Sequence, residues 1–328
     1  MKRNEVKTFA KRRYSILVAC RNEEENIENL FAGLRGLNYP VSMFEVIIVD
    51  DASSDGSWLL LQQEVQKSSN ISVFRLEEKS LDYKGKKAAL KFAAARSAYE
   101  YFLFTDADCL LPPDLLTSYN KKINDNTGAV IGWYITRNSS NLQRIVDFTT
   151  AMIFALSVYL DKAFSASGMN WVVSRQAFEK VGGYEKIRNI VAGDDKLLLL
   201  LVKKAGYRIN FNQEYPVSTK INREMSRQRM RRKYGKFASN PLPVKLSIIL
   251  VASYLLSMLI SMFRGQFDVT GYYIISMCLI WLSGLWHFQQ KFRFTDLAVF
   301  LFFPYLALYY TIAGSLGNWE WKDQYKSG

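Results

Sequence analysis

Three long apolar runs occupy the last quarter of this 328-residue chain. They cover residues 244–263, 269–288 and 297–316, and Lys245 is the only charged side chain within them. A helix of 20 residues at about 1.5 Å per residue is about 30 Å long, which matches the hydrocarbon core of a bilayer. We therefore expect three transmembrane helices. The alternative is a set of buried helices in a large soluble domain.

Charge is distributed unevenly on either side of residue 244. The chain has a formal net charge of +13, and residues 244–328 hold only six Lys or Arg and four Asp or Glu. Residues 223–236 hold seven basic side chains just before the first apolar run. Because cytoplasmic flanks of membrane helices are rich in Lys and Arg, residues 1–243 are predicted to be a cytosolic domain and 244–328 a membrane anchor. We expect an integral protein of the cell (inner) membrane.

Residues 1–243 alternate strand-like and helix-like patterns. Strands are predicted at residues 14–20, 44–49, 71–76, 101–105 and 128–136. Helices are predicted at residues 24–37, 57–67, 86–98 and 196–204. This order predicts an α/β fold with a mainly parallel sheet, whose ligands bind at the carboxyl ends of the strands. A dinucleotide-binding dehydrogenase is disfavoured, because the turn after the first strand is charged and lacks glycines.

Two further segments are expected to be interfacial or amphipathic helices, near residues 142–164 and 221–237. Residues 145–160 carry one charge, Asp147, and are short for a membrane span. In the second segment, Gln228, Arg231 and Arg232 would share one helix face. That basic segment can also be explained as an anchor for anionic lipids. No nucleic-acid partner is expected, since the basic residues concentrate beside the apolar runs.

Two carboxylates separated by one residue, Asp106 and Asp108, follow the fourth predicted strand. Carboxylates this close repel each other unless a cation lies between them, and hard oxygen ligands with room for phosphates suit Mg²⁺ or Mn²⁺. The pair is therefore a candidate metal site. An acidic turn before a helix that starts with proline is the alternative.

Two helix starts carry further candidates. Lys86 lies in a Lys-Gly-Lys-Lys segment that opens a predicted helix, where free N–H groups and the helix dipole favour a diphosphate. A solvated basic turn explains this segment equally well. Asp194 and Asp195 follow Gly193 at another helix start, where a carboxylate serves either as a cap or as a general base.

The motifs in this order resemble a membrane-anchored family 2 glycosyltransferase, which has the nucleotide-sugar-binding fold called GT-A. The donor half is Arg-Asn-Glu-Glu (residues 21–24), Val-Asp-Asp-Ala-Ser-Ser-Asp-Gly (49–56), Gly-Lys-Lys-Ala-Ala-Leu (85–90) and Thr-Asp-Ala-Asp (105–108). The acceptor half is Ser-Gly-Met-Asn (167–170), Val-Gly-Gly-Tyr (181–184) and Gly-Asp-Asp (193–195).

The resemblance implies a role for each candidate residue. Asp195 is expected to be the catalytic base, with Asp194 beside it, and Asp106 and Asp108 are expected to hold Mg²⁺ or Mn²⁺ and the donor. The other expected donor-binding residues are Arg21, Asn22, Glu23, Asp50, Asp51, Lys86, Gln228, Arg231 and Arg232. The implied reaction is inverting transfer of a sugar from a nucleoside-diphosphate sugar, with a UDP-sugar expected, to a hydroxyl group.

Three residues depart from the family pattern, and one of them, Arg232, bears on the expected product. Ala19 stands where the family has proline, and Asp194 stands where glutamate is common. Arg232 stands where processive synthases have a tryptophan, which favours transfer of one sugar to a lipid or lipid-linked acceptor. A processive polysaccharide synthase is the alternative, with a glycan acceptor. Two other classes remain: a catalytically silent, membrane-tethered binder of nucleotide-sugar or lipid, and a nucleotidyltransferase, which has no evident need for a membrane anchor.

Overall fold

The computed structural model describes residues 11–78, 80, 82–83, 85–190, 193–220, 242–315, 319–321 and 324–326. The chain divides into two compact units. Unit 1 comprises Met1–Arg137 and Asp147–Lys220, and unit 2 comprises Asn138–Val146 and Ile221–Gly328.

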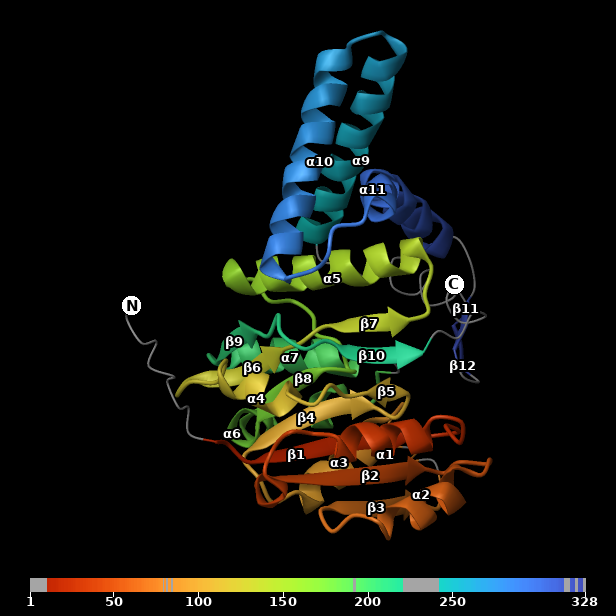
Figure 1. Ribbon diagram of the computed structural model, residues 1–328, viewed down its shortest axis with the longest axis vertical. Coiled ribbons are helices and arrows are strands. Elements are labelled where there is room, and N and C mark those ends of the chain that lie inside the picture. The colour runs from red at the N-terminus through yellow and green to blue at the C-terminus, as the bar shows by residue number, and fades with distance from the viewer. Residues whose placement is uncertain are drawn as a thin grey trace. The chain divides into compact units, whose positions relative to one another are not determined.

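Unit 1 is built on a seven-stranded sheet (Figure 1). Its strands, in spatial order, are β3 (Ile71–Leu76), β2 (Phe44–Asp51), β1 (Tyr14–Cys20), β4 (Tyr101–Asp106), β8 (Trp171–Ser174), β6 (Thr127–Ile131) and β9 (Arg208–Phe211). Strand β8 is antiparallel to both of its neighbours, and the other pairs are parallel. The predicted mainly parallel α/β sheet is confirmed.

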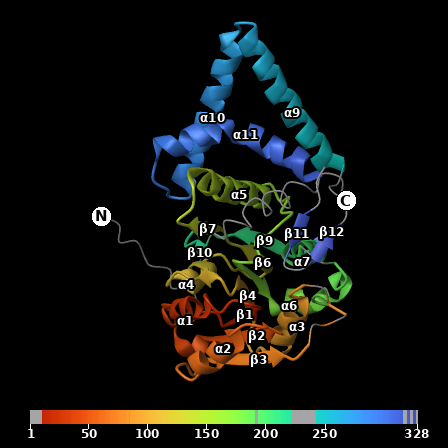
Figure 2. The same ribbon diagram turned by 90° about the vertical axis from the view of Figure 1, so that its right-hand side faces the viewer.

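Helices cover both faces of this sheet, as the alternating pattern predicts. They are α1 (Ile27–Arg35), α2 (Ser57–Val65), α3 (Lys87–Arg96), α4 (Leu115–Asn120), α6 (Arg175–Lys180) and α7 (Asp194–Lys204). The chain also forms α5 (Asn141–Tyr159), which begins in unit 2 and continues into unit 1, and short 3₁₀ turns at Val41–Met43 and Glu185–Ile187. Figure 2 shows α1 and α4 on one side of strands β1, β2 and β4, and α3 and α6 on the other. The helices predicted at 24–37, 57–67, 86–98, 145–160 and 196–204 are confirmed with shifted ends.

The run at residues 128–136 was predicted as one strand, and this prediction is wrong. It forms β6 in the main sheet and β7 (Tyr134–Arg137) in a second sheet of order β5 (Cys109–Leu110), β10 (Val217–Lys220), β7. The chain leaves the main sheet at Gly132, where an added Cβ would lie 2.4 Å from the Tyr119 hydroxyl and 2.5 Å from Asn170 Nδ2. Any larger residue would force Tyr119 or Asn170 to shift, so the close packing requires glycine where the chain passes from β6 to β7.

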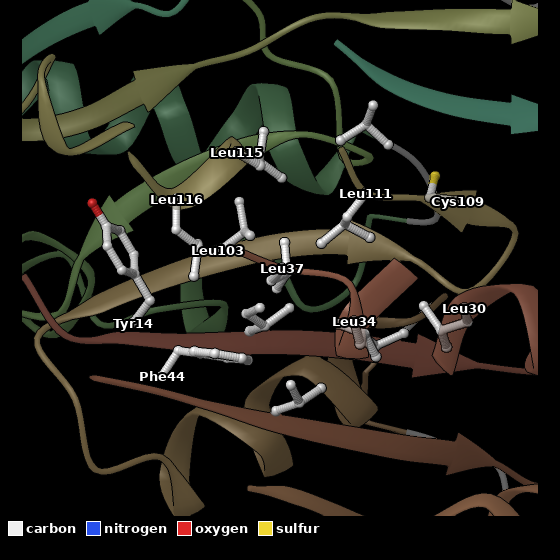
Figure 3. Close-up of a cluster of buried hydrophobic side chains, with 14 of the residues drawn as sticks. Tyr14, Leu30, Leu34, Leu37, Phe44, Leu103, Cys109, Leu111, Leu115 and Leu116 are labelled. Carbon is white, nitrogen blue, oxygen red and sulfur yellow. The ribbon is translucent and has the colours of Figure 1, made fainter. Parts of the chain in front are cut away.

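The spacing of apolar residues in the strands and in the helices explains the core of unit 1. Alternate residues of β1, among them Ile16 and Val18, point into one apolar cluster, because successive strand side chains face opposite sides of a sheet. Helix α1 faces the same cluster with side chains three and four positions apart, Leu30 and Leu34 among them. Figure 3 shows Leu30 and Leu34 of this cluster together with Leu103 of β4 and Leu115 and Leu116 of α4.

An aromatic cluster packs on the opposite face of the sheet. The Trp171 ring stacks on Phe104 with 5.2 Å between ring centroids, and Phe178 contacts Phe102 and Tyr184 edge to face. Tyr184 belongs to the Val-Gly-Gly-Tyr segment of the acceptor half. This cluster therefore fixes that segment against the main sheet, with a stacking energy of about 0.5–1.5 kcal/mol for each pair.

Unit 2 contains three long helices where the three apolar runs occur. They are α9 (Leu242–Phe263), α10 (Phe267–His287) and α11 (Phe294–Ser315), followed by the hairpin strands β11 (Trp319–Trp321) and β12 (Gln324–Lys326). Leu255, Met258 and Tyr273 form a small buried cluster between α9 and α10. The helices are confirmed, but the predicted membrane spans are not: within the described part of the chain, no helix is both long and apolar enough to cross a bilayer.

Candidate active site

The candidate residues gather at one edge of the main sheet. Strands β2, β1 and β4 are parallel neighbours, and their register pairs Cys20 with Asp50 and Ala19 with Asp106. The polar segments after these strands therefore start at the same edge. This is the edge, at the carboxyl ends of the strands, where ligands of such a sheet bind.

Arg21 and Asn22 brace the turn that follows β2. The Arg21 Nη1 donates to the main-chain oxygen of Asp51 at 3.0 Å, and the Asn22 amide oxygen accepts from the Ser54 N–H at 2.9 Å. Asn22 and Ala52 both have positive φ angles, 52° and 55°, so two left-handed turns meet here. These two residues shape the site through the main chain.

Asp50 is fully buried and forms an ion pair that the sequence did not predict. Its Oδ2 lies 3.3 Å from Arg75 Nε, and it accepts the Ser53 N–H at 3.2 Å. Among the described residues, its Oδ1 has no hydrogen-bond partner. Arg75 also lies over the Trp58 ring, 5.6 Å from the centroid. Arg75 is a residue of β3 and belongs to none of the motifs, so the sequence did not indicate this ion pair.

Asp51 and Glu23 lie beside this pair. Asp51 is 5% exposed at the last position of β2. Glu23 accepts a hydrogen bond from the Asn26 side chain at 2.8 Å, and its own N–H donates to Ser57 Oγ at 2.8 Å. Both carboxylates therefore occupy the edge to which the expected donor-binding residues belong.

Lys86 joins the donor and acceptor halves. Its ammonium donates to Asp106 Oδ1 and lies 4.0 Å from Asp194 Oδ2. Burial opposes the charged form, but the carboxylates of Asp106, Asp194 and Asp195 outweigh it and raise the pKa of Lys86. Gly168 admits this lysine, because a Cβ there would lie 3.1 Å from the ammonium. The structure thus makes Lys86 a charged partner of the acidic residues.

Asp195 is held by two main-chain donors. Its Oδ2 accepts the Gly168 N–H at 2.8 Å, and its Oδ1 accepts the Lys196 N–H at 2.8 Å. Burial and the neighbouring Asp194 raise the pKa of Asp195 to about 6, while these hydrogen bonds and Lys86 oppose the rise. A carboxylate with this pKa is ionised at neutral pH and accepts a proton more readily than an ordinary aspartate.

Asp108 is oriented by the second sheet. The Thr219 hydroxyl, on β10, donates to Asp108 Oδ2 at 3.0 Å, and Thr219 is fully buried. Strand β10 pairs with β5 so that Thr219 lies opposite Cys109, the residue after Asp108. Sequence reasoning missed Thr219, because it is 111 residues away from Asp108 in the chain.

Asp106 and Asp108 fit a divalent cation only in part. Among the residues that the structure describes, no group of three or more His, Cys, Asp or Glu side chains is placed to hold a metal ion. Mg²⁺, however, commonly takes one or two carboxylates and completes its shell with phosphate oxygens and water. The two carboxylates therefore suit a cation that arrives with a diphosphate.

Three of the expected donor-binding residues, Gln228, Arg231 and Arg232, lie outside the described residues.

The family of the chain follows from comparison with known proteins. The chain belongs to glycosyl transferase family 2, whose model matches residues 15–182. A second model, glycosyl transferase family group 2, matches residues 101–314. The first match contains the Asp50 and Asp106 strand ends described above.

Three similar proteins illustrate the family. A poly-beta-1,6-N-acetyl-D-glucosamine synthase from Staphylococcus epidermidis is 31% identical over 39% of this chain and 30% of its own length. The probable glycosyltransferase YdaM from Bacillus subtilis is 26% identical over 60% of this chain and 48% of its own. A dolichol-phosphate mannosyltransferase from Pyrococcus furiosus is 30% identical over 36% of this chain and 32% of its own. The chain thus spans less than half of each of these relatives.

One solved structure shares the fold along most of the chain. It is a mannosyltransferase from Pyrobaculum calidifontis in complex with GDP-Man and Mn²⁺, with a TM-score of 0.58 and 18% identity. The similarity covers 93% of this chain and 74% of that one. It supports a GT-A-like α/β fold.

Proposed function

We propose that this protein is an inverting glycosyltransferase that moves one sugar from a nucleoside-diphosphate sugar, a UDP-sugar by preference, to a hydroxyl group of a lipid or lipid-linked acceptor. The observation that carries the proposal is Asp195. It is held by two N–H groups and has a pKa raised to about 6, and its neighbour Asp194 lies 4.0 Å from Lys86, which also pairs with Asp106. Lys86 therefore links the carboxylate beside the base to a donor-binding carboxylate, which suits group transfer between two substrates.

The donor would bind at the edge formed by β1, β2 and β4. Asp51 and Glu23, at this edge, offer carboxylate acceptors for a nucleobase N–H, while the fully buried Asp50 supports the turn through the Ser53 N–H and Arg75. Asp106 and Asp108 would hold Mg²⁺ or Mn²⁺, which neutralises charge on the diphosphate. The complex of the similar mannosyltransferase with GDP-Man and Mn²⁺ supports this assignment. We also keep Gln228, Arg231 and Arg232 as donor-binding candidates.

The chemistry is a single displacement. Asp195 removes the proton from the acceptor hydroxyl, whose oxygen forms a bond to the anomeric carbon as the bond from that carbon to the diphosphate breaks. The proton remains on Asp195, and the charge on the departing diphosphate is opposed by Lys86. A positioned general base contributes about 10²- to 10⁴-fold in rate.

A lipid acceptor is favoured by an exposed apolar stripe in the unit that contains Asp195. Ile153 and Leu156, in the last two turns of α5, and Leu160, just after its end, are spaced three and four residues apart and are all more than 45% exposed. Residues at this spacing share a helix face. We propose that this face contacts a membrane, that the protein is membrane-bound, and that unit 1 faces the cytosol.

The test uses the purified full chain with radiolabelled UDP-, GDP- and dTDP-sugars and total membrane lipid. An organic-extractable labelled product supports the proposal, and Asp195→Asn must lower turnover by at least about 100-fold while donor binding by calorimetry persists. A long water-soluble polymer would show a processive synthase instead. Donor binding without any transfer or hydrolysis would show a silent binder.

Membrane association has its own assay. Extraction of membranes with alkaline carbonate separates integral from peripheral proteins, and Leu156→Glu together with Leu160→Glu should weaken binding to lipid vesicles. Val41→Glu is the matched control, since Val41 is 56% exposed and lies outside α5. Equal vesicle binding by wild type and the double variant would contradict the proposed contact.

A further inference from the structure

Lys87 is a fully buried lysine that no sequence argument singled out. It lies directly after Lys86, at the first position of α3, and none of its surface is exposed. Its ammonium donates to the main-chain oxygen of Ile190. Lys86, the N-cap of α3, and Lys87, its first residue, thus contact different parts of the site.

Burial of this ammonium is costly. Removal from water disfavours the charged form and lowers the pKa of Lys87, with Asp194 opposing and Lys86 adding to the effect. An apolar side chain of the same length would avoid this cost. Stability alone therefore gives no reason for a lysine here. The hydrogen bond to Ile190 indicates a different role for this side chain.

That contact lies on the segment that leads to the catalytic base. Ile190 is four residues before Asp194, where α7 begins, and Gly193 between them has a φ of 85°, in the left-handed region that favours glycine. Asp195 is the second residue of α7. The Lys87 bond therefore restrains the approach to α7 from α3, the helix that also presents Lys86 to Asp106 and Asp194.

We propose that Lys87 is a positioning residue, which holds the Ile190 segment so that Asp195 keeps its place relative to the donor-binding carboxylates. This role rests on the proposed function. Lys87 acts through the main chain and does not touch substrate. It therefore affects turnover and leaves donor binding in place, because Lys86, at the N-cap of α3, makes its contact with Asp106 separately. A misplacement of about 1 Å at a reacting group can cost about 100-fold in rate.

The experiment compares Lys87→Met and Lys87→Gln with Lys91→Met in the full chain. Lys91 is on the same helix, half-exposed, and pairs with Glu185 at the surface. Both Lys87 variants should lower kcat by about 100-fold with donor Kd within about twofold of wild type, while Lys91→Met keeps wild-type kcat. Lys87→Arg, which retains a cationic donor, should recover most of the lost kcat. Hydrogen exchange of residues 193–198 should accelerate in Lys87→Met and stay unchanged in Lys91→Met.

Two results would overturn the proposal. One is a folded Lys87→Met or Lys87→Gln protein whose kcat equals that of Lys91→Met. The other is unchanged exchange at residues 193–198 in a folded Lys87 variant. If Lys87→Met fails to fold, the shorter, polar Lys87→Gln carries both measurements. Failure of the proposed function would look different: wild type would transfer no sugar, and the exchange measurement would still decide whether Lys87 restrains α7.

Discussion

The pH dependence of turnover tests the electrostatics of the site most directly, through the substitution Asp194→Asn. Asp194 is one cause of the raised pKa of Asp195, after burial, so the neutral amide should lower that pKa. Only the ionised form of Asp195 accepts a proton. The acid limb of kcat/KM, which reports the free enzyme, should therefore move to lower pH.

The magnitude follows from the pKa of about 6 for Asp195. At that pKa about nine-tenths of the base is ionised at pH 7 and about one-tenth at pH 5, so wild-type kcat/KM should fall about tenfold over this range. A neighbouring charge shifts a carboxyl pKa by about 1 to 3 units. Even a shift of about one unit would leave half of the base ionised at pH 5, about five times the wild-type fraction.

The assay measures kcat/KM from pH 4.5 to 8, with each profile normalised to its own plateau. Normalisation is needed because Asp194 also lies 4.0 Å from Lys86, so its loss changes the plateau as well. Asp161→Asn is the control, since the Asp161 side chain is 99% exposed and lies outside the site. An acid limb that stays at the same pH or moves to higher pH in Asp194→Asn would refute the conclusion that Asp195 is the base and that Asp194 raises its pKa.

Three further substitutions test other parts of the structure. Asp108→Ala should abolish the part of donor binding that requires a divalent cation, which calorimetry with and without EDTA measures. Thr219→Val removes a buried hydrogen bond to the Asp108 carboxylate and should weaken cation-dependent donor binding by about tenfold, the equivalent of a charged hydrogen bond of about 1.5 kcal/mol. Gly132→Ala should lower Tm by several degrees, since its methyl group would collide with Tyr119 and Asn170 and cost about 1–3 kcal/mol; an unchanged Tm in a melting experiment would contradict this.

The family assignment establishes the class of the protein, whereas its acceptor and product are proposed. Family membership comes from matches that span residues 15–182 and 101–314. The acceptor and the number of sugars transferred remain proposals, and the domain boundary at residue 243 and the cytosolic location remain predictions. The product assay with labelled donors and lipid is therefore the measurement that adds most.

Local patterns in the sequence determined much of the fold. The apolar run at residues 14–20 coincides with β1, because a run of that length between polar residues has few other ways to bury its side chains. The rule that parallel strands end at one edge already predicts that Asp50 and Asp106 lie close together, as the register of β1 with β2 and β4 shows. Both inferences use only neighbours in the chain and the geometry of one sheet.

Contacts between distant segments were decided by the tertiary structure alone. Thr219 reaches Asp108 across 111 residues, Lys87 reaches Ile190 across 103, and Arg75 reaches Asp50 from a neighbouring strand. The requirement for glycine at position 132, just after β6, likewise comes from side chains of other segments. Periodicity reports which face of an element is buried, but it carries no information on which polar partner long-range packing brings to that face. For this reason the sequence identified the acidic residues of the site, whereas the residues that hold them in place emerged only from the fold.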